Sequence, residues 1–95
     1  MIKVAIIGLG IMGRRMLQHM RIHEKFEPSY LWDPDKNACR KAIEIDNKAK
    51  IMNSPEEAID AADLVYLACP PKVREAHAIS TAHKGKALFL EKPLG

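Results

Sequence analysis

The fold is decided by residues 2–13, which read IKVAIIGLGIMG. The apolar run Ile2–Ile7 predicts a β-strand, and the stretch from Ile11 to His23 predicts a helix. Between them, three glycines follow the spacing G-x-G-x-x-G. At a strand-to-helix turn this spacing is typical of a Rossmann fold that holds the pyrophosphate of a dinucleotide.

Each glycine of this loop has its own expected task. Gly8 allows a tight turn, Gly10 lets the backbone approach the phosphates, and Gly13 lets the helix pack closely on the strand. The first turn of a helix has unpaired N–H groups and the positive end of the helix dipole. We therefore expect the backbone of Gly10, Ile11 and Met12 to donate hydrogen bonds to phosphate oxygens.

Asp33 follows Gly13 by 20 residues and ends a second apolar run, Tyr30-Leu31-Trp32. A carboxylate at the tip of the second strand can accept hydrogen bonds from both hydroxyls of the adenosine ribose, and it would repel a 2′-phosphate. The sequence therefore favours NAD over NADP as the cofactor. Strand alternation predicts that Trp32 points away from the face of the Asp33 carboxylate.

Two alternatives stay open for the residues near the adenosine end of the cofactor. Asp33 could instead stabilise a turn or cap the helix that begins near Asp35, because Asp-Pro-Asp suits a turn. Arg14 or Arg15 could reach the adenosine end and hold the extra phosphate of NADP.

Composition and charge exclude several classes of protein. The chain has 95 residues, enough for one domain with a modest core, and it is 47% hydrophobic and 28% charged. It has no 18-residue apolar stretch and no signal peptide, so we expect a soluble, cytoplasmic protein without a membrane partner. The net charge of +3 is spread along the chain, which argues against a nucleic-acid partner.

The cysteines and histidines do not predict a metal site. Cys39 and Cys69 lie 30 residues apart without a CxxC spacing, so we interpret both as reduced packing residues. His19 and His23 are four residues apart, but no third ligand accompanies them, and a polar helix face explains them.

Strands alternate with helices along the chain, which predicts an α/β fold with a doubly wound parallel sheet. The predicted strands are Ile2–Ile7, Ser29–Trp32, a weak one near Ala49–Met52, Leu64–Ala68 and Ala87–Leu90.

The remaining helices are predicted from spacing and end signals. Ser54 caps a helix with Pro55 at its first position and Glu57 reaching back, and a helix from Pro71 to Lys84 is ended by Gly85. The helical faces expected to pack on the sheet consist of Ala38, Ala42, Ile45 and Ala49, and of Met12, Met16 and Met20.

Taken together, several motifs resemble the Gfo/Idh/MocA oxidoreductases over essentially all 95 residues. These motifs are the glycine loop, Asp33, residues 68–71 reading Ala-Cys-Pro-Pro after the fourth strand, and residues 91–93 reading Glu-Lys-Pro after the fifth. The resemblance implies NAD(P)-dependent oxidation or reduction at a hydroxyl or carbonyl carbon of a sugar, an inositol or a related small molecule.

The resemblance also implies roles for individual residues. Lys92 would be the catalytic residue at the reacting oxygen or the nicotinamide ribose, and Glu91 would orient it or contact that ribose. Cys69, Pro70 and Pro71 would line the nicotinamide side through their carbonyls.

This chain departs from the family's Thr-Pro-Asn and following histidine at that segment. Cys69 lacks the stronger hydroxyl hydrogen bond, Pro71 lacks an amide side chain and a backbone donor, and Arg74 stands at the histidine position. We interpret His77 as a packed or solvated helix residue.

Length sets the final expectation. Members of the family continue into a C-terminal domain that forms the substrate pocket and usually the oligomer interface. We therefore expect residues 1–95 to be a truncated cofactor-binding domain, inactive alone, whose full-length form is a homo-oligomer. Two other classes remain as alternatives: a non-catalytic dinucleotide-sensing or structural module, and a methyltransferase, which usually has an acidic residue ahead of the glycines.

Overall fold

The computed structural model describes residues 1–90, apart from the side chains of Pro71, Lys72 and Leu90. Strands and helices alternate along the chain. The strands are β1 (Ile2–Ile7), β2 (Phe26–Trp32), β3 (Lys50–Ile51), β4 (Leu64–Leu67) and β5 (Ala87–Leu90). The helices are α1 (Ile11–Met20), α2 (Lys36–Ile45), α3 (Pro55–Ala61) and α4 (Pro71–His83).

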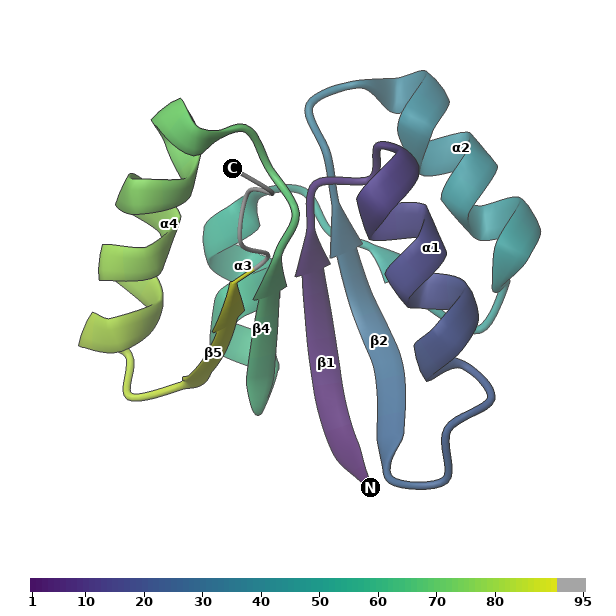
Figure 1. Cartoon of the computed structure of the whole chain (residues 1–95), viewed down its shortest axis with the longest axis horizontal. Helices are drawn as coiled ribbons and strands as arrows, with labels where there is room; N and C mark the ends of the chain where they lie inside the picture. Colours follow the sequence, from purple (N-terminus) through teal and green to yellow (C-terminus); the bar gives the residue numbers. More distant parts are fainter. Residues whose placement is uncertain (91–95) are drawn as a thin grey trace.

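The strands form one parallel sheet in the order β3-β2-β1-β4-β5. Helices α1 and α2 cover one face, and α3 and α4 cover the other (Figure 1). The chain winds from β1 outward to β3, returns to β4 on the other side of β1, and continues outward to β5. This arrangement confirms the predicted doubly wound α/β fold.

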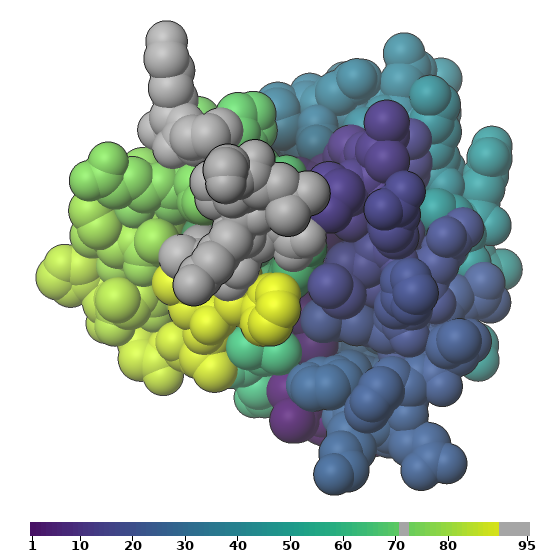
Figure 2. Space-filling view, viewed as in Figure 1, coloured from purple at the N-terminus to yellow at the C-terminus, as the bar shows by residue number. Residues whose placement is uncertain are grey.

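Successive side chains of β1 point to opposite faces of the sheet, and this explains why the core has two layers. Val4 and Ile6 belong to the core under α1 and α2, whereas Ala5 and Ile7 belong to the core above α3 and α4. All four are fully buried, as expected for a central parallel strand covered on both faces. Figure 2 shows the N-terminal part of the chain, in purple and blue, beside the C-terminal part, in green and yellow.

The second strand is longer than predicted. It begins at Phe26 because it pairs with β1 from Ile2 onward. The sequence predicted a start at Ser29, because the preceding Pro28 has no N–H group to donate to a neighbouring strand. The structure accommodates the proline with a register shift: Pro28 is opposite Val4, and Tyr30 is opposite the next residue of β1.

Other boundaries differ by a few residues. The first helix ends at Met20 rather than His23, β3 has only two residues, and β4 ends at Leu67. The fifth strand has the predicted bounds, and Gly85 adopts a left-handed φ of 69° beyond the end of α4.

The expected methionine face is only partly correct. Met20 is buried and Met16 packs against the same core, but Met12 is 41% exposed. It lies in the first turn of α1, where the helix projects beyond the end of β1. Ala49 lies outside α2, which ends at Ile45, although its side chain is buried in the same core.

Candidate functional site

A pocket of about 570 Å³ lies at the carboxyl ends of β1, β2 and β4. Its walls are the glycine loop, the end of β2 with residues 32–34, and the turn from β4 into α4 with the first half of that helix. Because the chain leaves β1 in one direction and returns to β4 in the other, this is the topological switch point of the sheet, where open α/β folds bind ligands.

Two glycines hold the loop close to neighbouring backbone. Gly8 has a φ of 100°, and a Cβ there would stand 2.7 Å from the carbonyl carbon of Ala68. A Cβ on Gly13 would overlap the carbonyl oxygen of Gly8. The tight turn at Gly8 and the close packing of the helix at Gly13 are therefore as predicted, and α1 sits directly on the end of β1.

Gly10, the middle glycine of the motif, faces open space. A Cβ on Gly10 would meet no atom within 4 Å. Gly10 is the N-cap of α1, provides no side-chain hydrogen bond to it, and is followed by no acidic residue in the first turn. Ile11 is 70% exposed. The first N–H groups of this helix can therefore be approached by an anion, with the positive end of the helix dipole behind them.

The next two helices have side-chain caps. In α2, Asp35 accepts a hydrogen bond from the Asn37 N–H at 2.9 Å. In α3, Ser54 accepts one from the Glu57 N–H at 3.1 Å, as predicted. The fourth helix has no side-chain cap but begins with prolines, which lack the N–H group. In the described part of the chain, α1 thus has the N-terminus best suited to a phosphate.

Asp33 connects the end of β2 to the glycine loop. Its Oδ2 accepts a hydrogen bond from the Leu9 N–H at 2.6 Å, and its Oδ1 accepts one from the Asp35 N–H at 2.7 Å. The second contact is the turn role considered as an alternative, whereas the cap of α2 is Asp35 itself. Each carboxylate oxygen has a further lone pair, so these bonds leave acceptor capacity for ribose hydroxyls.

The two arginines of α1 behave differently. Arg14 donates from Nη1 to the carbonyl of Leu9 at 2.9 Å and so braces the glycine loop from the side. Arg15 is exposed. Arg14 is therefore engaged with the loop backbone in this structure rather than directed to an extra phosphate.

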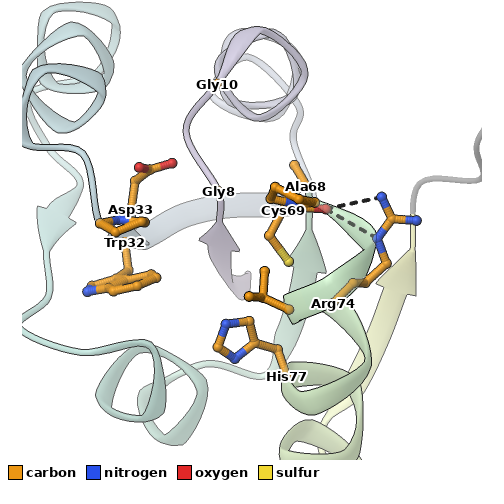
Figure 3. Close-up of a pocket in the computed structure, with 11 residues that line it drawn as sticks. Gly8, Gly10, Trp32, Asp33, Ala68, Cys69, Arg74 and His77 are labelled. Carbon is orange, nitrogen blue, oxygen red and sulfur yellow. Dashed lines mark hydrogen bonds between the residues drawn. The ribbon is translucent and has the colours of Figure 1, made fainter.

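The turn after β4 is held by Arg74. Its Nε and Nη2 donate to the carbonyl of Cys69 at 3.3 and 3.1 Å (Figure 3). Cys69 is buried, and burial raises the pKa of its thiol, with the Arg74 charge partly opposing the rise. Pro70 is exposed beside the pocket. The Pro71 side chain, Glu91 and Lys92 lie outside the described residues.

Sequence reasoning missed two aromatic residues of the pocket. The Trp32 indole and the Asp33 carboxylate point to opposite sides of the end of β2, as alternation predicts (Figure 3). The pocket nevertheless reaches both sides of the end of β2, so Trp32 and Asp33 both line it. His77 of α4 also lines it, with its ring centroid 6.3 Å from that of Trp32 and the two rings inclined at 72°. The only signal in the sequence was the aromatic character of both residues.

The other cysteine, Cys39, lies next to the backbone of Asp33. Cys39 of α2 is buried and donates from Sγ to the carbonyl of Asp33 at 3.4 Å. Burial raises the pKa of this thiol as well, and both cysteines are free.

The histidines of the first helix region are placed apart from this pocket. His23 lies beyond the end of α1, where its Nδ1 accepts a hydrogen bond from the Lys25 N–H at 3.1 Å and its ring contacts Phe26. No group of three or more His, Cys, Asp or Glu side chains within residues 1–90 is arranged to hold a metal ion. No helix in this part of the chain has the length and apolar character needed to cross a bilayer.

The doubly wound sheet, the glycine turn and the acidic tip of β2 define a dinucleotide-binding Rossmann domain. Comparison with known families agrees: the oxidoreductase family described as having an NAD-binding Rossmann fold, Gfo/Idh/MocA, matches residues 2–95. The chain therefore belongs to the Gfo/Idh/MocA family, as the motifs in the sequence suggested.

Individual relatives are similar to this chain in sequence or in fold. An uncharacterized oxidoreductase of Streptococcus pneumoniae serotype 4 is 33% identical over 96 residues, which cover 99% of this chain and 25% of the relative. Myo-inositol dehydrogenase of Lactobacillus casei, solved with NAD(H) and myo-inositol, is 26% identical with a TM-score of 0.86 over 99% of this chain and 29% of its own. Biliverdin reductase of Synechocystis sp. PCC 6803, solved with biliverdin and NADP+, has a TM-score of 0.90 at 23% identity and covers 99% of this chain and 30% of its own. This chain thus spans less than a third of the length of these relatives.

Proposed function

We propose that this chain binds NAD as the cofactor domain of a dehydrogenase or reductase that transfers a hydride to or from a hydroxyl or carbonyl carbon. The observation that carries the proposal is the open N-terminus of α1 next to the carboxylate of Asp33. The backbone of Gly10, Ile11 and Met12 would hold the pyrophosphate, and Asp33 would hold the adenosine ribose.

The pocket fits such a cofactor in both its chemistry and its shape. An anion can approach Gly10 because no atom stands within 4 Å of the Cβ position. Gly8 and Gly13 keep α1 close to β1, so the donors face the pocket. When bound, the nicotinamide would supply the hydride chemistry. The chain's own contribution here is to bind and orient the cofactor.

The nicotinamide half would lie toward the turn after β4. Cys69 and the prolines that follow it are proposed to line that side. Arg74 donates two hydrogen bonds to the Cys69 carbonyl, one for each of its lone pairs, and so holds this side of the turn in place. Lys92 is proposed as the catalytic residue at the reacting oxygen, with Glu91 orienting it, on the family resemblance.

The substrate is proposed to be a sugar, an inositol or a related small molecule. A relative solved with myo-inositol supports this class, whereas one solved with biliverdin widens it. The substrate pocket and a homo-oligomer interface are proposed to belong to a C-terminal domain, so residues 1–95 alone would bind cofactor without turnover. A cytoplasmic location and the absence of nucleic-acid and membrane partners stay predictions.

The test is a calorimetric titration of the 95-residue chain with NADH, NADPH and S-adenosylmethionine. We expect saturable NADH binding, weaker NADPH binding and no S-adenosylmethionine binding. Asp33→Ala removes a charged acceptor and should weaken NADH about 10- to 100-fold, the effect of a hydrogen bond to a charged group. Asp35→Ala is the matched control, because its carboxylate caps α2.

Each contrary result has a definite meaning. NADPH binding at least as tight as NADH would overturn the assignment of Asp33 and turn attention to Arg15. Failure of a folded chain to bind either nucleotide would contradict the proposed cofactor role and favour a structural module.

A further inference from the structure

The large pocket carries opposite charges on its two sides. Among the described residues that line it, Asp33 is the one carboxylate and Arg74 is the one permanent cation. Asp33 directly follows β2, and Arg74 belongs to the first turn of α4. The two side chains lie on opposite sides of the glycine loop (Figure 3). The pocket therefore has a negative side at β2 and a positive side at β4.

Two hydrogen bonds fix the place of the positive charge. Nε and Nη2 of Arg74 both donate to the Cys69 carbonyl, at 3.3 and 3.1 Å, so the planar guanidinium is held in one orientation. Arg74 is half-buried, so its charge is screened less than that of an exposed arginine. This charge lowers the pKa of the Cys69 thiol by more than the charge of Asp33 raises it, although burial outweighs both.

The oxidised and reduced forms of NAD differ in charge at one place, the nicotinamide ring. The ring is positively charged in NAD+ and neutral in NADH, whereas the adenosine and the pyrophosphate are the same in both. In the proposed function the nicotinamide half lies toward the turn after β4, which is the turn that Arg74 holds. A fixed cation there repels the charged ring of NAD+ and leaves the neutral ring of NADH unaffected.

We infer that Arg74 makes this domain bind NADH more tightly than NAD+. The inference rests on the proposed NAD function and goes beyond it, because it assigns the preference between the two redox forms to one side chain. By linkage, the bound cofactor is then easier to reduce than the free cofactor, by the ratio of the two Kd values. Where the family pattern has a histidine, which is only partly charged at neutral pH, this chain has a permanent charge.

The test measures the Kd of NAD+ and the Kd of NADH by calorimetry and compares their ratio between variants. The titrations are made at low salt and about pH 8, above the ordinary titration range of histidine. We expect the original chain to bind NADH more tightly than NAD+. Arg74→Gln removes the charge and keeps an amide donor, so the ratio should fall about three- to tenfold, the effect of one partly screened charge.

Two further variants separate charge from structure. Arg74→Lys keeps the charge without the forked hydrogen bonds and should retain most of the ratio. Arg40→Gln removes the same charge from an exposed position on α2, outside this pocket, and should leave the ratio unchanged. Titration with ADP-ribose, which lacks the nicotinamide, reports on the rest of the site. A variant that only disturbs the turn changes all three Kd values together and leaves the ratio as it was.

The outcomes separate this inference from the proposed function. If both forms of NAD bind but Arg74→Gln changes the ratio by less than about twofold, Arg74 does not set the preference, while the NAD role stands. An equal fall in Arg74→Lys and Arg74→Gln would also overturn the inference, because the charge would then have no effect. If neither form binds the folded chain, both the function and the inference are overturned.

One measurement needs no variant, and it keeps the inference testable if a substitution prevents folding, which a thermal melt would show. Raising the salt concentration to about 0.5 M screens the charge of Arg74, so the ratio of the two Kd values in the original chain should move toward one. A ratio that does not depend on salt would contradict an electrostatic origin of the preference.

Discussion

The N-termini of α1 and α3 form by opposite means. In α3 the Ser54 hydroxyl accepts the Glu57 N–H, and two glutamates occupy the first turn. In α1 the cap is Gly10, which has no side chain to offer, and the first turn has no acidic residue. The first helix therefore leaves its N–H groups and its dipole available, whereas the third satisfies both internally.

The comparison shows how a sequence can separate stability from binding. The chain uses its own side chains to stabilise α3, which lies away from the pocket. It leaves α1 without a cap where the pocket opens and stabilises that helix through backbone contacts at Gly8 and Gly13 instead. A substitution at the Ser54 cap should therefore change stability, and a substitution at the Gly10 N-terminus should change binding.

The largest expected effect is at the packing contact of α1. Gly13→Ala places a methyl group against the Gly8 carbonyl, so either the helix must move or the loop must open. We expect a loss of about 3 kcal/mol or more in the free energy of unfolding, measured by urea denaturation. Gly85→Ala is the control: its φ of 69° disfavours a side chain, but no atom is nearby, so the cost should be about 1–2 kcal/mol. Equal losses in both variants would contradict the close-packing argument.

The next effect is on binding alone. Gly10→Ala adds a methyl group to open space, so its stability should stay within about 1 kcal/mol of the original chain. The same methyl group stands where a phosphate must approach the backbone, and the Kd for NADH should rise at least tenfold by calorimetry. Unchanged NADH affinity would show that the anion binds away from this N-terminus.

Ser54→Ala should give the reverse result. Loss of the cap should cost about 1 kcal/mol of stability, the usual value for a serine N-cap, and should leave the Kd for NADH unchanged. Urea denaturation and calorimetry on the same sample measure both quantities. A change in NADH affinity without a change in stability would contradict the conclusion that the cap of α3 contributes to stability and not to binding.

The smallest effect concerns the two thiols. Burial raises the pKa of Cys39 and of Cys69, so each holds less thiolate at neutral pH than an unfolded cysteine and should react more slowly with Ellman's reagent. The folded state also binds more protons at alkaline pH, so stability should fall as the pH rises above the ordinary thiol range. The variants Cys39→Ser and Cys69→Ser separate the two rates. Because only Cys69 lines the large pocket, NADH should slow its reaction and leave that of Cys39 unchanged.

Much of the fold could be predicted because its signals are local. Apolar runs, the Ser54 cap and Gly85 act over a few residues, and they located the strands and the helix ends closely. The start of β2 was missed because Pro28 interrupts the strand pattern while the pairing with β1 continues past it. Met12 was misplaced because helical spacing does not reveal where α1 projects beyond the sheet.

The site could be predicted only in part. Three glycines at a fixed spacing and an acidic strand tip indicate the cofactor side, because the motif is contained in one strand, one turn and one helix. The opposite wall could not be predicted, because Trp32 and His77 come from strand and helix segments 45 residues apart and meet only when β2 and β4 flank β1.

The sequence by itself determined the alternation of strands and helices, the glycine turn, the caps and the family, because each depends on residues near one another in the chain. Only the tertiary structure decided that Asp33 bonds the Leu9 N–H and that an indole and an imidazole line the same pocket. These contacts depend on the order of the strands and the seating of the helices, which arise from burying both faces of the whole sheet at once.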